Sequence, residues 1–250
     1  MNDAVIWAIP PPNLKLEPDE VHIWRASLNV ATSKVESLLT ILCAEEQQKA
    51  HRFRFPKDQK HFIVARGLLR IILGRYLDKK PSELSFSYNQ YGKPALLSAD
   101  STQTICFNVS HSHELALIAV TQNCDIGVDL EYIRPDVPCE QIAQSCFSPR
   151  ERAVLRQISA DLKTSVFFTG WTRKEAYLKA TGKGLSLPLD QFDVSLIPGE
   201  PAKLLNTQWD MSEADRWLLH KLTPGSGYVA ALATAAGVWR VKCWQVSSEE

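Results

Sequence analysis

Apolar residues recur along the chain with two periods, one typical of helices and one typical of strands. The longest helical pattern covers 57–77, where apolar side chains three and four residues apart form one stripe. A second covers 162–180 and precedes Gly182, a residue type common at left-handed helix caps. A shorter pattern covers 32–42. Alternating or continuous apolar runs predict strands at 21–28, 84–88, 105–109, 115–121, 126–131, 192–196, 216–222, 228–234 and 238–246.

The four residues from Ser148 to Glu151 predict the start of a further helix. Ser148 is a typical N-cap, Pro149 suits the first turn, and Glu151 stands three residues after the cap. A serine and a glutamate at this spacing can each bond the other's backbone N–H group, an arrangement called a capping box. We therefore expect a helix to begin directly after Ser148.

The predicted strands and helices do not alternate strictly, which favours an α+β fold. A faint internal repeat runs through them: a long amphipathic helix, a Gly-Lys turn and a Phe-x-Val-Ser strand occur twice in the same order. The three parts lie at 57–77, 92–93 and 107–110, and again at 162–180, 182–183 and 192–195. Unless chance produced it, the repeat indicates two similar halves, 1–124 and 125–250, with a ligand cleft between them.

Composition and charge describe an ordinary globular protein. Hydrophobic residues make up 45% of the chain and charged residues 22%. Lysine plus arginine equals aspartate plus glutamate, at 28 each, so no net charge would draw the chain to nucleic acid or to an acidic membrane. The chain starts without a cationic, apolar leader, and its most apolar stretch, 228–239, is too short to span a bilayer. The six cysteines form no Cys-x-x-Cys pair, so we expect reduced thiols and a cytoplasmic protein.

Two short segments carry carboxylates that could do chemistry. Asp129 and Glu131 alternate in a predicted strand, so their side chains share one face. Glu175 and Lys179 are four residues apart in the second long helix and share a helical face. Carboxylate oxygens are ligands that Mg²⁺ prefers, and a lysine beside them suits a bound phosphate. The four side chains predict a magnesium and polyphosphate site rather than a dedicated zinc site.

Plainer interpretations exist for both segments. An Asp-x-Glu on a strand is commonly a solvated face, and Glu175 with Lys179 could be a surface ion pair of little energy. However, Asp129 and Glu131 end an apolar strand, and Glu175 lies among aromatic residues. Because a buried glutamate is costly without a cation or hydrogen bonds, the carboxylates taken together favour a metal site.

A third group of candidates lies in Asn108-Val-Ser-His-Ser-His113 and in the tight turn Tyr91-Gly-Lys-Pro94. His111 and His113 could form a His-x-His metal pair, or they could be an ordinary core histidine and its exposed neighbour. Ser110 and His111 could instead donate hydrogen bonds to a phosphate. No P-loop or Rossmann glycine motif is present, so side-chain cations and a metal would have to hold any phosphate.

In their order along the chain, these segments resemble the Sfp-type 4′-phosphopantetheinyl transferases. The resemblance is carried by Gly127-Val-Asp-Leu-Glu131, Phe147-Ser-Pro-Arg-Glu151, Trp171-Thr-Arg-Lys-Glu-Ala-Tyr-Leu-Lys179 and Gly182-Lys-Gly-Leu-Ser-Leu-Pro-Leu189. Upstream it is carried by Ala65-Arg-Gly-Leu-Leu-Arg70, Tyr91-Gly-Lys-Pro94 and Asn108-Val-Ser-His111. The length resembles that of the larger, monomeric type rather than that of the small, trimeric holo-acyl-carrier-protein synthases.

The resemblance implies a pseudo-twofold α+β fold that binds coenzyme A in the cleft between its halves. It implies that Asp129, Glu131 and Glu175 hold Mg²⁺ together with the pyrophosphate of coenzyme A. Lys179 is expected to contact the same pyrophosphate.

At the nucleotide end, which carries the 3′-phosphate, the resemblance implies contacts from Lys93, Ser110 and His111, and we add Arg66 to this basic pocket. One position departs from the pattern. Glu46 stands where some relatives carry a lysine, and Lys49 follows one turn later. Part of the 3′-phosphate contact seen in such relatives is therefore not expected here.

The implied reaction moves the phosphopantetheine arm of coenzyme A to a serine hydroxyl of an apo acyl or peptidyl carrier protein. Adenosine 3′,5′-bisphosphate is the other product. In such a phosphoryl transfer, positioning and charge neutralisation supply most of the catalysis. Glu175 is the candidate base for the serine proton, either directly or through a metal-bound water.

Two other functions remain alternatives at this point. A metal-dependent hydrolase would use His111, His113, Asp129 and Glu175 and would need a nitrogen-rich site. A non-catalytic module would only bind coenzyme A or the carrier. For carrier docking, 132–161 is the candidate segment, and its helix would offer Val154, Leu155 and Ile158 either to a carrier or to the core of the protein itself.

Overall fold

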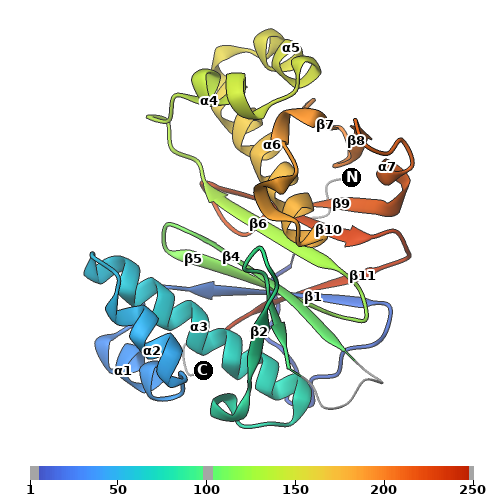
Figure 1. Cartoon of the computed structure of the whole chain (residues 1–250). Helices are drawn as coiled ribbons and strands as arrows, with labels where there is room; N and C mark the ends of the chain where they lie inside the picture. The colour runs from blue at the N-terminus through green and yellow to red at the C-terminus, as the bar shows by residue number, and fades with distance from the viewer. Residues whose placement is uncertain (1–5, 98–103, 248–250) are drawn as a thin grey trace.

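Two β-sheets lie face to face at the centre of the protein, and one long helix covers the outer side of each (Figure 1). The computed structural model describes residues 6–97 and 104–247. The two long helices, α3 (Pro56–Leu77) and α6 (Ala160–Thr181), are each 22 residues long. The mixture of antiparallel strands and helices makes the fold α+β, as predicted.

The first sheet has the strand order β11-β1-β5-β4. Its strands are β1 (Glu20–Ser27), β4 (Ile105–Ser112), β5 (Leu115–Gln122) and β11 (Arg240–Gln245). Strand β1 is antiparallel to β5 and parallel to β11, which comes from the far end of the chain. Beside this sheet lie helices α1 (Thr32–Thr40), α2 (Ala44–His51) and the 3₁₀ turn Pro81–Glu83, followed by a hairpin of β2 (Phe86–Tyr88) and β3 (Pro94–Leu96).

The second sheet has the strand order β6-β10-β9 and is antiparallel throughout. Its strands are β6 (Ile126–Tyr132), β9 (Trp217–Leu222) and β10 (Tyr228–Ala235). Around it lie helices α4 (Cys139–Cys146), α5 (Pro149–Gln157) and α7 (Glu213–Arg216). A small sheet pairs β7 (Phe192–Val194) with β8 (Leu204–Thr207), and 3₁₀ turns cover Gly184–Ser186 and Leu189–Gln191.

The order of elements repeats along the chain. Each series runs from one strand through short helices to a 22-residue helix, then through a small two-stranded sheet to two antiparallel strands. The Phe-x-Val-Ser motifs do not occupy equivalent places in this order, because 107–110 lies in β4 of the first large sheet whereas 192–195 begins in β7 of a small one. The repeat therefore belongs to the architecture, and the short motif that suggested it does not mark matching strands.

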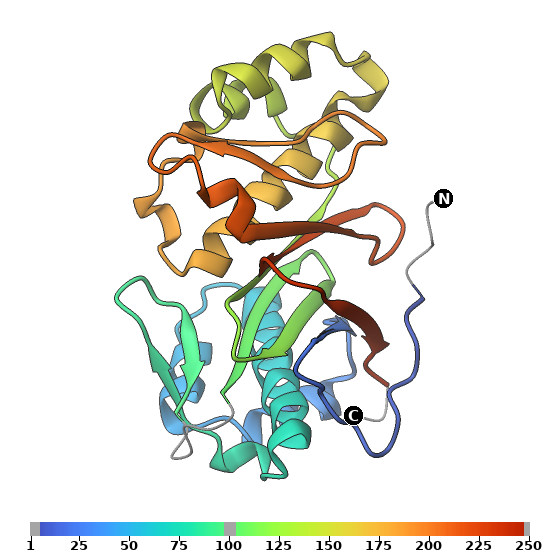
Figure 2. The ribbon, with the colours of Figure 1, turned by 90° about the vertical axis from the view of Figure 1, so that its right-hand side faces the viewer.

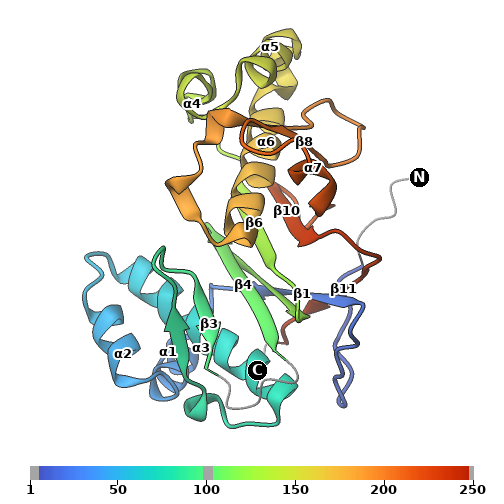
Figure 3. The ribbon, with the colours of Figure 1, turned by 45° about the vertical axis from the view of Figure 1, so that its right-hand side comes forward.

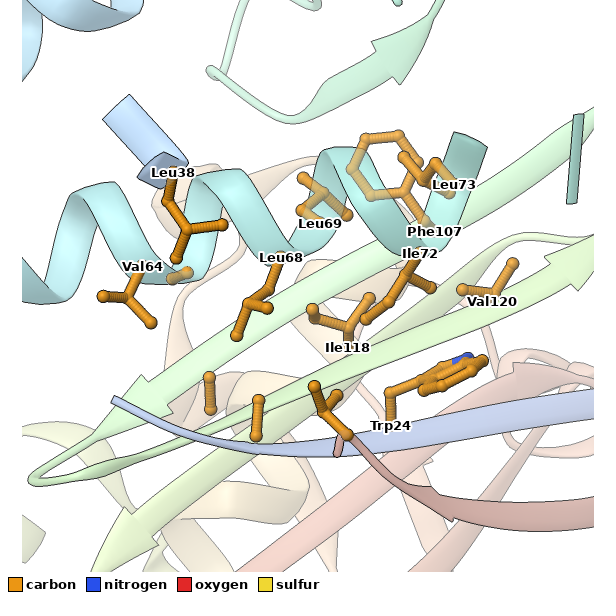
Figure 4. Close-up of a cluster of buried hydrophobic side chains, with 14 of the residues drawn as sticks. Trp24, Leu38, Val64, Leu68, Leu69, Ile72, Leu73, Phe107, Ile118 and Val120 are labelled. Atoms are coloured by element: carbon orange, nitrogen blue, oxygen red, sulfur yellow. The ribbon is translucent and has the colours of Figure 1, made fainter. Parts of the chain in front are cut away.

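Three hydrophobic clusters hold the layers together. One lies between α3 and the first sheet, where Trp24, Leu69, Ile72 and Ile118 pack (Figure 4). A second lies between α6 and the second sheet. The third lies between the two sheets and is built by strand residues of one parity, such as Ile126, Val128 and Leu130 of β6. Strand alternation thus leaves the other face of β6 free for polar side chains.

The local signals of the sequence are largely confirmed. Ser148 caps α5 with the reciprocal bonds of a capping box, and Gly182 ends α6 with a left-handed φ of 67°. Helix α2 was not predicted, because its sequence AEEQQKAH has no apolar period and is held by the burial of Glu46 and Ala50. Helix α4 and strands β3 and β8 were also missed. All six cysteines are free thiols.

Candidate active site

Strand β6 presents its candidate carboxylates to α6 because the two elements lie in direct contact. A Cβ atom on Gly127 would stand 2.1 Å from the carbonyl oxygen of Ala176, so only glycine lets the helix approach so closely. Two residues further along the same face, Asp129 meets Lys179 of α6. The Gly127-Val-Asp-Leu-Glu131 segment therefore combines a packing residue with the carboxylates that follow it.

Asp129 is almost completely buried, and among the described residues only its Oδ1 atom has hydrogen-bond partners. Its Oδ1 atom lies 2.6 Å from Lys179 Nζ and accepts a hydrogen bond of 2.9 Å from Ser110 Oγ. Lys179 also donates to Ser110 Oγ over 2.9 Å. The Oδ2 atom of Asp129 is buried without a hydrogen-bond partner among the residues that the structure describes. A buried carboxylate oxygen left in this state is a place where a cation would be stabilised.

The three carboxyl groups influence one another. Burial raises the pKa of Asp129, Glu131 and Glu175 above the ordinary carboxyl value, and the charge of Asp129 adds to the rise at both glutamates. Lys179 opposes the rise in all three cases. A bound cation would favour the charged form of each of these carboxyl groups. Over residues 6–97 and 104–247, however, no three His, Cys, Asp or Glu side chains already stand as a set of metal ligands.

Strand β4 passes β6 where the two sheets meet (Figure 3). A ladder of side-chain hydrogen bonds joins the two strands there. The polar residues on one face of β4 accept hydrogen bonds from alternate backbone N–H groups of β6. The bonds run from Val128 to Asn108 Oδ1 at 2.9 Å, from Leu130 to Ser110 Oγ at 3.2 Å and from Tyr132 to Ser112 Oγ at 3.1 Å. Ser112 also donates to Glu131 Oε2 over 2.8 Å. The ladder thus fixes both acidic residues of β6 against the first half of the chain.

A groove of about 240 Å³ opens between the β2–β3 turn, β4 and α6. Its lining includes Tyr91, Lys93, Asn108, Glu175 and Lys179. A neighbouring cavity of about 340 Å³ continues along the hairpin and shares Lys93 with it. The two cavities meet at Lys93, Pro94 and Gly182, and together they suit an elongated ligand.

Lys93 lines the groove with its aliphatic stem, and its ammonium is bound to backbone. It donates to the carbonyl oxygens of Ala180 at 2.9 Å and of Ile126 at 3.2 Å. Burial lowers the pKa of this lysine. The structure therefore brings Lys93 to the predicted ligand groove while giving its charge a structural task at the end of α6.

His111 and His113 contact different parts of the protein. His111 alternates with Ser110 on β4 and so projects from the opposite face, where Asp58 and His61 of α3 are its electrostatic neighbours. Loss of hydration in its surroundings and the nearby charge of Lys179 lower its pKa. His113 occupies a turn with a φ of 53° and stacks on Tyr132, with ring centroids 4.7 Å apart. The His-x-His metal pair of the hydrolase alternative is therefore not supported.

Arg66 is engaged with protein groups rather than open to a ligand. Its guanidinium bonds the carboxylate of Glu46 and donates to Tyr88 Oη over 3.0 Å. Glu46 also accepts from Arg70 Nε over 2.7 Å. The glutamate that departs from the family pattern thus binds the arginine that we had added to the basic pocket.

The predicted carrier segment gives its apolar face to the core. Leu155 of α5 is buried in the cluster beneath α6, and Val154 and Ile158 pack against that cluster. Of the two interpretations of this helix, core contact is the one that the structure supports.

No helix in the described ranges is long and apolar enough to cross a membrane.

Three residues near the site were given no role from the sequence. Ser112 and Asn108 bond β6, and Asn89 bonds the carbonyl oxygen of Gly182 at 2.8 Å. The alternation of Asn108, Ser110 and Ser112 on one strand was a usable signal, since three small polar residues of one parity predict a polar strand face.

Comparison with known proteins decides the family. The family model described as 4′-phosphopantetheinyl transferase, N-terminal, matches residues 24–123, and that of the 4′-phosphopantetheinyl transferase superfamily matches residues 125–233. The 4′-phosphopantetheinyl transferase HetI of Nostoc sp. is 42% identical over 95% of this chain and 97% of its own length. The chain belongs to the 4′-phosphopantetheinyl transferase superfamily.

Within this superfamily the chain resembles the Sfp type. The 4′-phosphopantetheinyl transferase Sfp of Bacillus subtilis is 33% identical over 64% of this chain and 69% of its own length. A solved holo-acyl-carrier-protein synthase of Thermotoga maritima is 18% identical, with a TM-score of 0.36 over 46% of this chain and 64% of its own, which is too distant to bear on the fold. The protein is thus a 4′-phosphopantetheinyl transferase, an enzyme that transfers phosphopantetheine to carrier proteins.

Proposed function

We propose that this transferase moves the 4′-phosphopantetheine arm of coenzyme A to a serine of an apo acyl or peptidyl carrier protein in a Mg²⁺-dependent reaction. Coenzyme A would lie in the groove between the halves 1–124 and 125–250, and adenosine 3′,5′-bisphosphate would be released. The observation that carries the proposal is the buried Oδ2 atom of Asp129, which has no hydrogen-bond partner among the described residues, in a carboxylate that binds the groove-lining Lys179 through its other oxygen.

The donor set fits a magnesium ion. Asp129, Glu131 and Glu175 offer only oxygen atoms, which is the ligand type of Mg²⁺, and a divalent cation would counter the rise that burial causes in their pKa values. These three side chains would hold the ion. When bound, Mg²⁺ would neutralise negative charge on the pyrophosphate during the transfer.

The protein's own residues would do the rest of the chemistry. Lys179 lines the groove and would place a positive charge against the pyrophosphate, where charge grows as the leaving group departs. The serine oxygen of the carrier would form a bond to the phosphorus that bears pantetheine. The bond from this phosphorus to the bridging oxygen would break, and the electron pair would leave with the bisphosphate.

Glu175 is the proposed acceptor for the serine proton, either directly or through one water. Burial and the charge of Asp129 raise the pKa of Glu175 in the metal-free protein. Ligation of Mg²⁺ would lower the basicity of the same carboxylate, so proton transfer through a bridging water is an equal route. The remaining predicted contacts, from Ser110, His111, Lys93 and Arg66, would serve the nucleotide end. Since Arg66 is bound by Glu46, we expect the weakest contribution from it.

A direct assay tests the proposal. The protein is incubated with coenzyme A, Mg²⁺ and apo carrier proteins from fatty-acid, polyketide and peptide pathways. The mass of each carrier is then measured by mass spectrometry. We expect the mass gain of a phosphopantetheine arm, its loss on chelation of the metal, and its severe reduction in Glu175→Gln. Glu140→Gln, a change in an exposed residue of α4, is the matched control. Mass gain that persists in chelator would refute the metal dependence.

We also expect the enzyme to act as a monomer in the cytoplasm. Sedimentation of the purified protein tests the first expectation, and cell fractionation tests the second.

A further inference from the structure

The turn between β2 and β3 is attached to the end of α6 by two side chains. Asn89 Nδ2 donates to the carbonyl oxygen of Gly182 over 2.8 Å, and Lys93 Nζ donates to that of Ala180 over 2.9 Å. The turn belongs to the first half of the chain and α6 to the second. In Figure 2 the hairpin, drawn in green, rises toward the segment that follows the end of α6. This attachment, which we call the clasp, therefore spans the groove at one end.

The clasp satisfies backbone groups that a helix leaves open. The last carbonyl groups of an α-helix have no partner inside the helix, and a positive charge is favourable at that end. Gly182 fits between the two clasp residues: a Cβ atom there would stand 3.2 Å from Lys93 Cδ and 3.3 Å from Asn89 Nδ2. Its left-handed φ of 67° also requires glycine. The end of α6 is thus shaped to receive the turn.

Asn89 does two tasks with one amide group. Its Oδ1 atom accepts the backbone N–H groups of Tyr91 and Lys93, each at 2.9 Å, and so shapes the turn. Its Nδ2 atom donates to α6. The orientation of the amide is determined by its partners, because two donors lie on one side and a carbonyl lies on the other. Lys93 is thus bonded to Asn89 through its backbone and to α6 through its side chain.

The position of the turn determines the groove. Tyr91 and Lys93 form one wall, and Glu175 and Lys179 of α6 form the facing wall. We propose that Asn89 is a positioning residue of this transferase, which holds the β2–β3 turn against the end of α6 and thereby sets the width of the coenzyme A groove. The role rests on the proposed placement of coenzyme A in this groove.

Two substitutions distinguish the bond that Asn89 makes to α6 from the bonds that it makes within the turn. Asn89→Asp keeps an oxygen for the N–H groups of Tyr91 and Lys93 but turns a second oxygen toward the Gly182 carbonyl. Asn89→Ala removes both tasks without adding charge. The control is Asn123→Asp, because Asn123 also accepts a backbone N–H group, from Thr104 at 2.9 Å, in the turn between β5 and β6.

The measurements are KM for coenzyme A, kcat, the melting temperature and the calorimetric affinity for adenosine 3′,5′-bisphosphate. One net hydrogen bond corresponds to a change of about 3- to 10-fold, so we expect KM and the bisphosphate dissociation constant to rise by roughly this factor in both Asn89 variants. We expect kcat to stay within about twofold and the control to match wild type, since the clasp contacts no reacting atom.

Each other result would refute either the positioning role of Asn89 or the placement of coenzyme A in the groove. Wild-type KM in Asn89→Asp would mean that only the shape of the turn matters. A rise in Asn89→Asp without one in Asn89→Ala would mean that the new charge repels the ligand. Lys179→Ala tests the placement of coenzyme A, because Lys179 lines the groove from α6. Unchanged bisphosphate and coenzyme A affinity in Lys179→Ala would refute that placement, whereas weakened affinity in Lys179→Ala alone would refute only the role of Asn89.

Discussion

Lys179 and Asp129 join α6 to β6 through a contact of 2.6 Å between Nζ and Oδ1. The contact divides the carboxylate, because Oδ1 also bonds Ser110 whereas Oδ2 has no partner in the described ranges. One oxygen thus keeps the two elements together, and the other is left for a ligand. The lysine predicted to bind pyrophosphate and the aspartate predicted to bind metal are neighbours before either ligand arrives.

We expect Asp129→Asn to abolish most activity while preserving the fold. The amide oxygen can still accept from Lys179 and Ser110, but the charge that would hold Mg²⁺ is lost. Turnover should fall about 100-fold or more, as for other changes at metal sites. The melting temperature should change little, because burial already disfavours the charged form and raises its pKa. Asp136→Asn, in an exposed loop, is the control. Wild-type turnover in Asp129→Asn would remove this residue from the metal site.

Ser112→Ala should weaken metal binding by releasing Glu131. The hydroxyl donates to Glu131 Oε2 over 2.8 Å and accepts from Tyr132 N over 3.1 Å, so it both aims the carboxylate and joins the sheets. We expect the Mg²⁺ concentration for half-maximal rate to rise about 10-fold. Stability should fall by about 1 kcal/mol. Ser145→Ala on α4, which removes only local contacts to Ile142 and Cys146, should change neither quantity. An unaltered magnesium requirement would show that Glu131 needs no such support.

The elements predicted best are those whose signals are local. The period of apolar residues was enough to predict α3 and α6. A capping serine marked the start of α5, and a terminal glycine marked the end of α6. Helix α2 lacks an apolar stripe and is stabilised by tertiary contacts, which a local pattern does not contain. The pairing of β11 with β1 joins distant parts of the chain and was equally invisible.

In the candidate site, too, local patterns predicted which residues share a face but not which faces meet. Alternation placed Asp129 and Glu131 on one face, and the helical period placed Glu175 and Lys179 on another. The contact between the two faces depends on the approach of α6 to Gly127, which only the packing reveals. The pairing of Arg66 with Glu46 could not be predicted for the same reason, since Glu46 comes from a helix with no apolar period.

Glu46→Gln should destabilise the protein in a pH-dependent way. Burial works against the charge of Glu46, but the hydrogen bond from Arg70 and the charge of Arg66 outweigh it and hold its pKa below the ordinary value. The unfolded chain then binds more protons than the folded one between the two pKa values. The stabilisation is therefore complete above the ordinary carboxyl pKa of about 4.3 and is lost as pH falls through the lower folded value.

At pH 7 the substitution leaves buried Arg70 without its counter-charge, so we expect a loss of roughly 3 kcal/mol in the free energy of unfolding. Urea unfolding at several pH values measures it. The difference from wild type should shrink as the carboxyl becomes protonated in acid. Glu45→Gln, in the exposed neighbour on α2, is the control. A pH-independent difference would show that the charge of Glu46 is not the cause.

Gly127→Ala should separate α6 from β6 and so damage stability and activity together. The added methyl group would stand 2.1 Å from the Ala176 carbonyl oxygen and 2.3 Å from the backbone nitrogen of Ala180, and neither backbone atom can turn aside as a side chain could. We expect a loss of roughly 3 kcal/mol, measured by urea unfolding. The catalytic rate per folded molecule should also fall, because α6 carries both Glu175 and Lys179. Gly225→Ala places its methyl group in open space and should behave as wild type. Equal stability of the two variants would mean that the strand and helix can part without cost, and the close approach would then not be what positions the site.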